Sequence, residues 1–161
     1  MGTDTTIIRR AQWAVVWDEV HARHRYVRDA DVVCVATNSR DPVLFGRWLK
    51  PGVHVNAVGS FTPQMSELDV EVVARASVFV DTVEAAVAEA GDLLAAERAD
   101  GTHRERWVEI GAVAAGLTGG RTSPEEITLF KSVGQAVQDV AVTARALEVA
   151  RAKGLGVEIE L

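Results

Sequence analysis

The sequence predicts an α/β fold in which a mostly parallel sheet is flanked by helices and followed by a long C-terminal helix. Short valine-rich runs at residues 32–36, 53–58 and 78–80 alternate with stretches of helical periodicity. These runs are continuously apolar, as is typical of parallel strands that are covered on both faces. The spacing indicates βαβ units, for which we expect right-handed crossovers.

Each predicted strand ends at a polar or glycine-bearing segment. Residues 32–36 end at Thr37-Asn38-Ser39, residues 53–58 end at Gly59, and residues 78–80 end at Asp81. Residues 127–130 predict a further strand, and the alternating residues 157–161 predict an edge strand. The glycine-rich residues 116–121 predict a loop.

The predicted helices are placed by their capping residues. Asp69 is expected to cap a helix over residues 68–76, and Asp81 with Glu84 a helix through residues 85–93. Ser132 is expected to cap the long helix that Gly154 ends. Residues 11–20 predict a short helix from one apolar face, and residues 123–126 carry a helix-start pattern of serine, proline and carboxylate.

Composition excludes several classes of protein. A chain of 161 residues predicts one domain, and a net charge of −6 without a basic stripe argues against nucleic-acid binding. No apolar run is long enough to cross a membrane, and the first residues do not resemble a signal peptide. The single Cys34 excludes an internal disulfide, so a reducing cytoplasm is the simplest location.

The strand ends are the candidate ligand site, because open parallel sheets bind ligands beyond the carboxyl ends of their strands. We expect the strand ends near Thr37 and Gly59 and the helix start at Ser132 to converge on one crevice. Residues 37–39, 59–63 and 81–82 offer glycine, hydroxyl and amide groups, although ordinary loop starts use the same residues and are favoured on these residues alone. The predicted helix start at 132–134 favours an anionic or carbonyl ligand, or is a plain N-cap. Lys131 either faces a carboxylate or is solvated.

No metal site is expected. His21 and His24 are three residues apart, and a solvated basic face is favoured over a ligand pair. His54 and His103 have no obvious partner, and Cys34 is typical of a small core residue.

Four segments in a specific order resemble one family. They are ADVVCVATNSRDPV at residues 30–43, LKPGVHVNAVGS at 49–60, ELD at 67–69, and EITLFKSVG at 126–134 followed by Gln138-Asp139. Together they resemble the ornithine cyclodeaminase/mu-crystallin family over about residues 28–161. Residues 1–27 form an atypical N-terminal segment.

The resemblance implies a Rossmann-type domain that binds NAD or NADP in a homodimer. It implies an oxidoreductase or cyclodeaminase acting on an amino acid, keto acid or cyclic imine. By position, Thr37, Asn38 and Ser132 would contact the cofactor, and Val58, Gly59 and Ser60 would lie near the nicotinamide. Phe61, Val133 and Gly134 would lie at the substrate. No catalytic residue is assigned.

Two departures from the family modify this expectation. Phe61 stands where the cyclodeaminases carry an aspartate, which favours a reductase, because a phenyl ring cannot relay protons. Family members are about twice as long, and their GxGxxA loop for the pyrophosphate has no counterpart here. The chain is thus expected to be a truncated Rossmann-like domain that associates as a homodimer or with a complementary chain. The alternative is a catalytically inactive remnant or a dimerising binding module.

Overall fold

The computed structural model describes residues 13–15, 27–101, 104–157 and 159. At its centre lies a six-stranded sheet with the spatial order β1-β2-β3-β6-β4-β5, in which every pair of neighbours is parallel. The predicted mostly parallel sheet is therefore confirmed. The strands are β1 (Trp13–Val15), β2 (Val32–Val35), β3 (His54–Ala57), β4 (Ser77–Val80), β5 (Val108–Glu109) and β6 (Thr128–Lys131).

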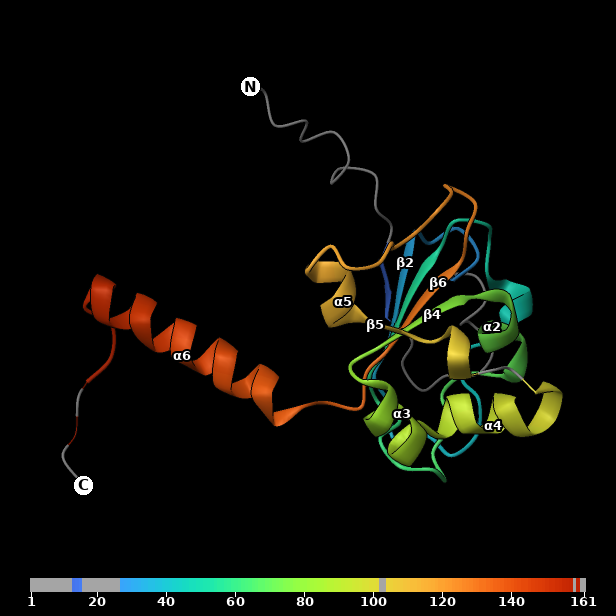
Figure 1. Ribbon diagram of the computed structural model, residues 1–161, viewed down its shortest axis with the longest axis horizontal. Helices are drawn as coiled ribbons and strands as arrows, with labels where there is room; N and C mark the ends of the chain where they lie inside the picture. Colours follow the sequence, from blue (N-terminus) through green and yellow to red (C-terminus); the bar gives the residue numbers. More distant parts are fainter. Residues whose placement is uncertain (1–12, 16–26, 102–103, 158, 160–161) are drawn as a thin grey trace.

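Helices cover the sheet unequally. The helices α2 (Val70–Arg75), α3 (Val83–Glu89) and α4 (Gly91–Asp100) lie on one side of the sheet, and α5 (Ile110–Ala114) lies on the other (Figure 1). Short 3₁₀ turns, η2 (Gly46–Trp48) and η3 (Arg104–Arg106), complete the connections. Alternate strand residues such as Val33, Val55 and Leu129 are fully buried and join Val72 and Leu93 of the helices in one core. Among the described residues, no helix combines the length and the apolar character that crossing a bilayer requires.

The predicted helix over residues 11–20 is wrong where the structure describes it. Trp13–Val15 is a strand that pairs in parallel with Val32–Cys34 of β2. Pairing with a neighbouring strand overrides a weak helical pattern, because each strand residue gains ladder hydrogen bonds. The rest of that segment, with His21 and His24, lies outside the described residues, as does His103.

The helix predicted through residues 85–93 is in fact two helices. The chain bends at Ala90 (φ −78°, ψ 83°), where α3 ends and α4 begins. The cap of α3 is Thr82, whose Oγ1 accepts from the amide of Ala85 at 3.2 Å, and not Asp81. By contrast Asp69 caps α2 as predicted, accepting from the amide of Val72 at 3.0 Å.

The long C-terminal helix α6 (Ala136–Lys153) begins later than predicted. Gly134 adopts φ 86°, so the chain turns before the helix starts, and Ser132 is not its cap. Gly154 ends the helix with φ 63°, as predicted. The helix extends away from the sheet, and none of its residues is buried (Figure 1).

Two further predictions differ from the structure. Residues 123–126 form a single turn, because the Glu126 carboxylate accepts from the amides of Thr122 and Ser123 and closes the turn on itself. Val157 and Ile159, the described part of the predicted edge strand, are exposed and belong to no strand. In the part of the chain that the structure describes, no strand lies beside them to pair with.

Candidate functional site

The ends of β2 and β3 are in direct contact. The amides of Thr37 and Gly59 both donate to the carboxylate of Glu67, Thr37 to Oε1 and Gly59 to Oε2, the latter at 2.8 Å. The amide of Ser60 also donates to Oε2, at 3.0 Å. A Cβ atom at Gly59 would overlap the backbone of Thr37, so only glycine permits this approach.

The end of β6 joins the same edge of the sheet. The amide of Ser132 donates to the carbonyl of Ala57 at 3.1 Å. The ammonium group of Lys131 donates to the carbonyls of Ser60, at 2.5 Å, and of Ser132, at 3.1 Å. The predicted convergence of residues near Thr37, Gly59 and Ser132 is therefore present. We call Thr37, Asn38, Val58, Gly59, Ser60 and Ser132 the strand-end cluster.

The carboxylate of Asp81 accepts hydrogen bonds from the residues that follow β6. Its Oδ2 accepts from the Ser132 hydroxyl at 2.8 Å and from the amides of Val133, at 2.8 Å, and Gly134, at 3.0 Å. Its Oδ1 accepts from the side-chain amide of Gln138 at 2.7 Å. Burial alone would raise the pKa of Asp81, but these donors together bring it below its usual value. The amides expected to favour an external anion at 132–134 are thus satisfied by this carboxylate.

Lys131 is buried in an ion pair. Its side chain is fully enclosed, and its Nζ lies 3.5 Å from Oδ2 of the equally enclosed Asp92. Burial lowers the pKa of Lys131, although Asp92 and Glu67 oppose that shift. Of the two expectations for Lys131, the carboxylate partner is correct.

Sequence reasoning missed two of these carboxylates. The sequence pattern places Glu67 only within the ELD segment and assigns no role to Asp92. Asp92 precedes the buried residues Leu93 and Ala96 of α4, and a charge on the apolar stripe of a helix is the signal that could have found it.

The candidate residues differ in their exposure to solvent. Val58 is 47% exposed and Phe61 54%, so two apolar side chains face outward from the loop after β3. Thr37, Ser132 and Val133 are half-buried, whereas Asn38 and Gly134 are exposed. Ser60 is fully buried, and its hydroxyl donates to the carbonyl of Met65 at 3.0 Å.

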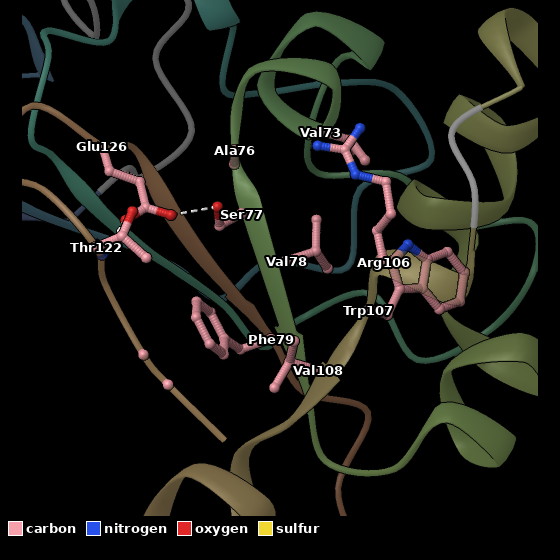
Figure 2. A pocket seen from close by; sticks show the side chains of 12 residues that line it. Val73, Ala76, Ser77, Val78, Phe79, Arg106, Trp107, Val108, Thr122 and Glu126 are labelled. Carbon is pink, nitrogen blue, oxygen red and sulfur yellow. Dashed lines mark hydrogen bonds between the residues drawn. The ribbon is translucent and has the colours of Figure 1, made fainter.

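A cavity of about 240 Å³ lies along β4 and β5, where Ser77, Phe79 and Val108 line it (Figure 2). The hydroxyl of Ser77 donates to Glu126 on one side, and Trp107 and Arg106 lie on the other. The bonds from Ser77 and Thr122 lower the pKa of Glu126 to about 2. None of the residues that line this cavity belongs to the strand-end cluster, so the two are separate.

His54 has partners that the sequence did not indicate. Its Nδ1 lies 2.8 Å from Thr128 Oγ1, and its Nε2 lies 3.3 Å from Asn56 Oδ1. Burial lowers the pKa of His54 below its usual value. Within the described ranges, no group of three or more potential ligand side chains is arranged to hold a metal ion.

Comparison with known proteins gives a consistent result. The model of the ornithine cyclodeaminase/mu-crystallin family matches residues 7–154. The match therefore begins within residues 1–27, the segment that the sequence predicts to be atypical. Delta(1)-pyrroline-2-carboxylate reductase of Bacillus cereus is 44% identical over 137 residues, which cover 83% of this chain and 42% of the relative. Ketimine reductase mu-crystallin of Mus musculus is 40% identical, over 71% of this chain and 34% of its own.

The solved structures that this chain resembles are also of a reductase and a dehydrogenase. The reductase of Thermococcus litoralis, in complex with NADH and L-proline, superposes with a TM-score of 0.77 at 34% identity, covering 84% of this chain and 42% of its own. An archaeal alanine dehydrogenase dimer with bound NAD superposes at 0.74 with 40% identity, over 86% and 43%. The chain therefore spans less than half the length of the proteins it matches.

Proposed function

Because this chain belongs to the ornithine cyclodeaminase/mu-crystallin family, we propose that it is the nicotinamide-binding part of an oxidoreductase that reduces a cyclic imine or a related amino or keto acid. The observation that carries the proposal is the contact of the β2, β3 and β6 ends at one edge of a parallel sheet. The relatives reported above are reductases and an alanine dehydrogenase, which disfavours the alternative of an inactive remnant.

The proposed cofactor is NAD or NADP. Val58 offers an exposed apolar surface to the flat nicotinamide ring, and Gly59 lets the loop after β3 lie directly against Thr37. Thr37, Asn38 and Ser132 would hold polar groups of the adjoining ribose and amide, with the backbone of Ser60 completing the loop. The bound cofactor supplies the hydride, and this chain orients the ring. The sequence has no loop matching GxGxxA, so these residues fit the nicotinamide half of the molecule.

The substrate would lie against Phe61, Val133 and Gly134. An exposed phenyl ring offers contact area but neither donates nor accepts a proton, so reduction is favoured over cyclodeamination. The amides of Val133 and Gly134 already donate to the carboxylate of Asp81. A substrate carboxylate would therefore find its hydrogen-bond donors elsewhere.

Nucleotide titration tests this function. We expect the chain to quench NADH or NADPH fluorescence on binding, and Gly59→Ala to abolish the effect by forcing the β2 and β3 loops apart. Gly111→Ala is the matched control, because a Cβ there meets open space. Failure of the unaltered chain to bind either nucleotide would refute the proposal. Equal binding by both variants would refute the placement of the site.

We also propose that α6 packs against a second copy of this chain or a complementary chain. Val137, Val140 and Leu147 are 70%, 67% and 49% exposed, and helices of this length take most of their stability from tertiary packing. Light scattering at micromolar concentration would detect the association, and a monomer would refute it. A cytoplasmic location is proposed from the free, half-buried thiol of Cys34, and cell fractionation checks it.

A further inference from the structure

One buried carboxylate is shared between two loops of the strand-end cluster. Oε1 of Glu67 accepts from the amide of Thr37 after β2, and Oε2 accepts from the amides of Gly59 and Ser60 after β3. Glu67 itself is fully buried. Each oxygen therefore serves a different strand end, and the side chain sets the distance between the two.

Asp92 fixes the backbone of Glu67. Its Oδ1 accepts from the amide of Glu67 at 2.5 Å, from that of Leu68 at 2.9 Å, and from the Ser66 hydroxyl at 3.3 Å. Asp92 lies in the first turn of α4, so a packed helix is the base of this arrangement. Its other oxygen faces Lys131.

Lys131 holds the same loop from the opposite side. Its ammonium group donates to the carbonyls of Ala57, at 3.3 Å, and Ser60, at 2.5 Å. The segment from Ala57 to Ser60 is thus bound through its carbonyls by a cation and through its amides by an anion. Two charges of opposite sign define where this loop lies.

A neutral side chain could not replace Glu67. A carboxylate has two equivalent acceptor oxygens, whereas a glutamine amide has one oxygen and one donor. Bonds from backbone amides to a carboxylate are also roughly twice as strong as neutral ones. An anion buried here is costly unless its bonds are made, and both oxygens of Glu67 accept from backbone amides.

We propose that Glu67 is a positioning residue for the nicotinamide site: it holds the loops after β2 and β3 at the spacing that the cofactor requires, supported by Asp92 and Lys131. This inference rests on the proposed function. Glu67 touches neither cofactor nor substrate and acts through Thr37 and Gly59.

The test compares Glu67→Gln with a variant of matched stability. In Glu67→Gln the oxygen would remain with the paired amides of Gly59 and Ser60, and the amide group would face the N–H of Thr37, donor against donor. Val72→Ala is the control, because Val72 is a fully buried core residue of α2 outside the strand-end cluster. Glu67→Asp, one methylene shorter, keeps the charge but reaches only one loop.

Amide exchange measured by NMR gives a readout that needs no cofactor. We expect the Thr37 amide to exchange roughly tenfold faster in Glu67→Gln than in Val72→Ala at equal global stability. Titration with the nucleotide that binds should give a dissociation constant raised roughly tenfold in Glu67→Gln and unchanged in Val72→Ala.

The outcomes separate the two proposals. If the unaltered chain binds neither NADH nor NADPH, the proposed function fails, and amide exchange alone decides whether Glu67 positions the loops. The positioning role is overturned if the Thr37 amide exchanges at the same rate in Glu67→Gln and Val72→Ala. It is also overturned if these two variants bind the nucleotide with the same dissociation constant. If Glu67→Gln and Glu67→Asp both fail to fold while Val72→Ala folds, Glu67 is structural only and the proposal is overturned.

Discussion

Replacing Lys131 by methionine should destabilise the protein strongly, although it exchanges one buried side chain for another of similar length. The substitution removes the counter-charge 3.5 Å from Asp92 Oδ2. That oxygen is buried and makes no hydrogen bond among the described residues, so the ion pair is its remaining compensation. The carbonyls of Ala57, Ser60 and Ser132 lose a donor as well.

The magnitude follows from the geometry of the pair. Removing one partner of a buried ion pair costs about 3–5 kcal/mol, because a charge is left uncompensated. The separation of 3.5 Å is long for such a pair, and burial still lowers the pKa of Lys131. We therefore expect the lower end, about 3 kcal/mol. For a chain of this size that lowers the melting temperature by roughly 6–12 °C.

A double-mutant cycle measured by urea unfolding isolates the interaction. Asp92→Asn keeps the Oδ1 acceptor for the amides of Glu67 and Leu68 but removes the charge facing Lys131. The double variant should therefore be more stable than Lys131→Met alone. A loss below about 1 kcal/mol for Lys131→Met, the value of an exposed pair, would refute the reasoning. Strict additivity of the two substitutions would refute it as well.

Three further outcomes are expected. The pKa of Glu126 is lowered to about 2, so its carboxylate should make the protein more stable to unfolding than the Glu126→Gln variant. This extra stability is complete above the ordinary pKa of 4.5 and is lost as pH falls from 4.5 towards 2. Urea unfolding at several pH values checks this, and a difference independent of pH would contradict it. Burial lowers the pKa of His54, so its ring should be neutral at pH 7. Because Oδ1 of Asn56 can only accept, Nε2 carries the proton and Nδ1 accepts from the Thr128 hydroxyl. Nitrogen-15 NMR would show a protonated Nδ1 if this were wrong. Asp69→Ala should cost roughly 2 kcal/mol, the upper end for a helix cap, because Asp69 also accepts from the amide of Gly46 at 2.9 Å. A melting temperature unchanged by Asp69→Ala would contradict that estimate.

The sequence by itself predicted β2, β3, β4 and β6, the parallel sheet and the family, but neither β1 nor β5. The valine runs of β2 and β3 and the Asp69 cap depend on residues within a few positions of one another, so local patterning suffices to place them. The convergence of Thr37, Gly59 and Ser132 also followed, because the carboxyl ends of neighbouring parallel strands must meet at one edge.

Only the tertiary structure decided which polar groups satisfy one another at that edge. The sequence predicts a helix cap at Asp81 and another at Ser132. In the structure the two side chains are hydrogen-bonded to each other, although they lie 51 positions apart in the sequence. Glu67 reaches Thr37 across 30 positions, and Lys131 pairs with Asp92 of a helix packed beneath the sheet. A buried charge takes whatever partner the fold brings near it, and sequence spacing carries no information about contacts of that range.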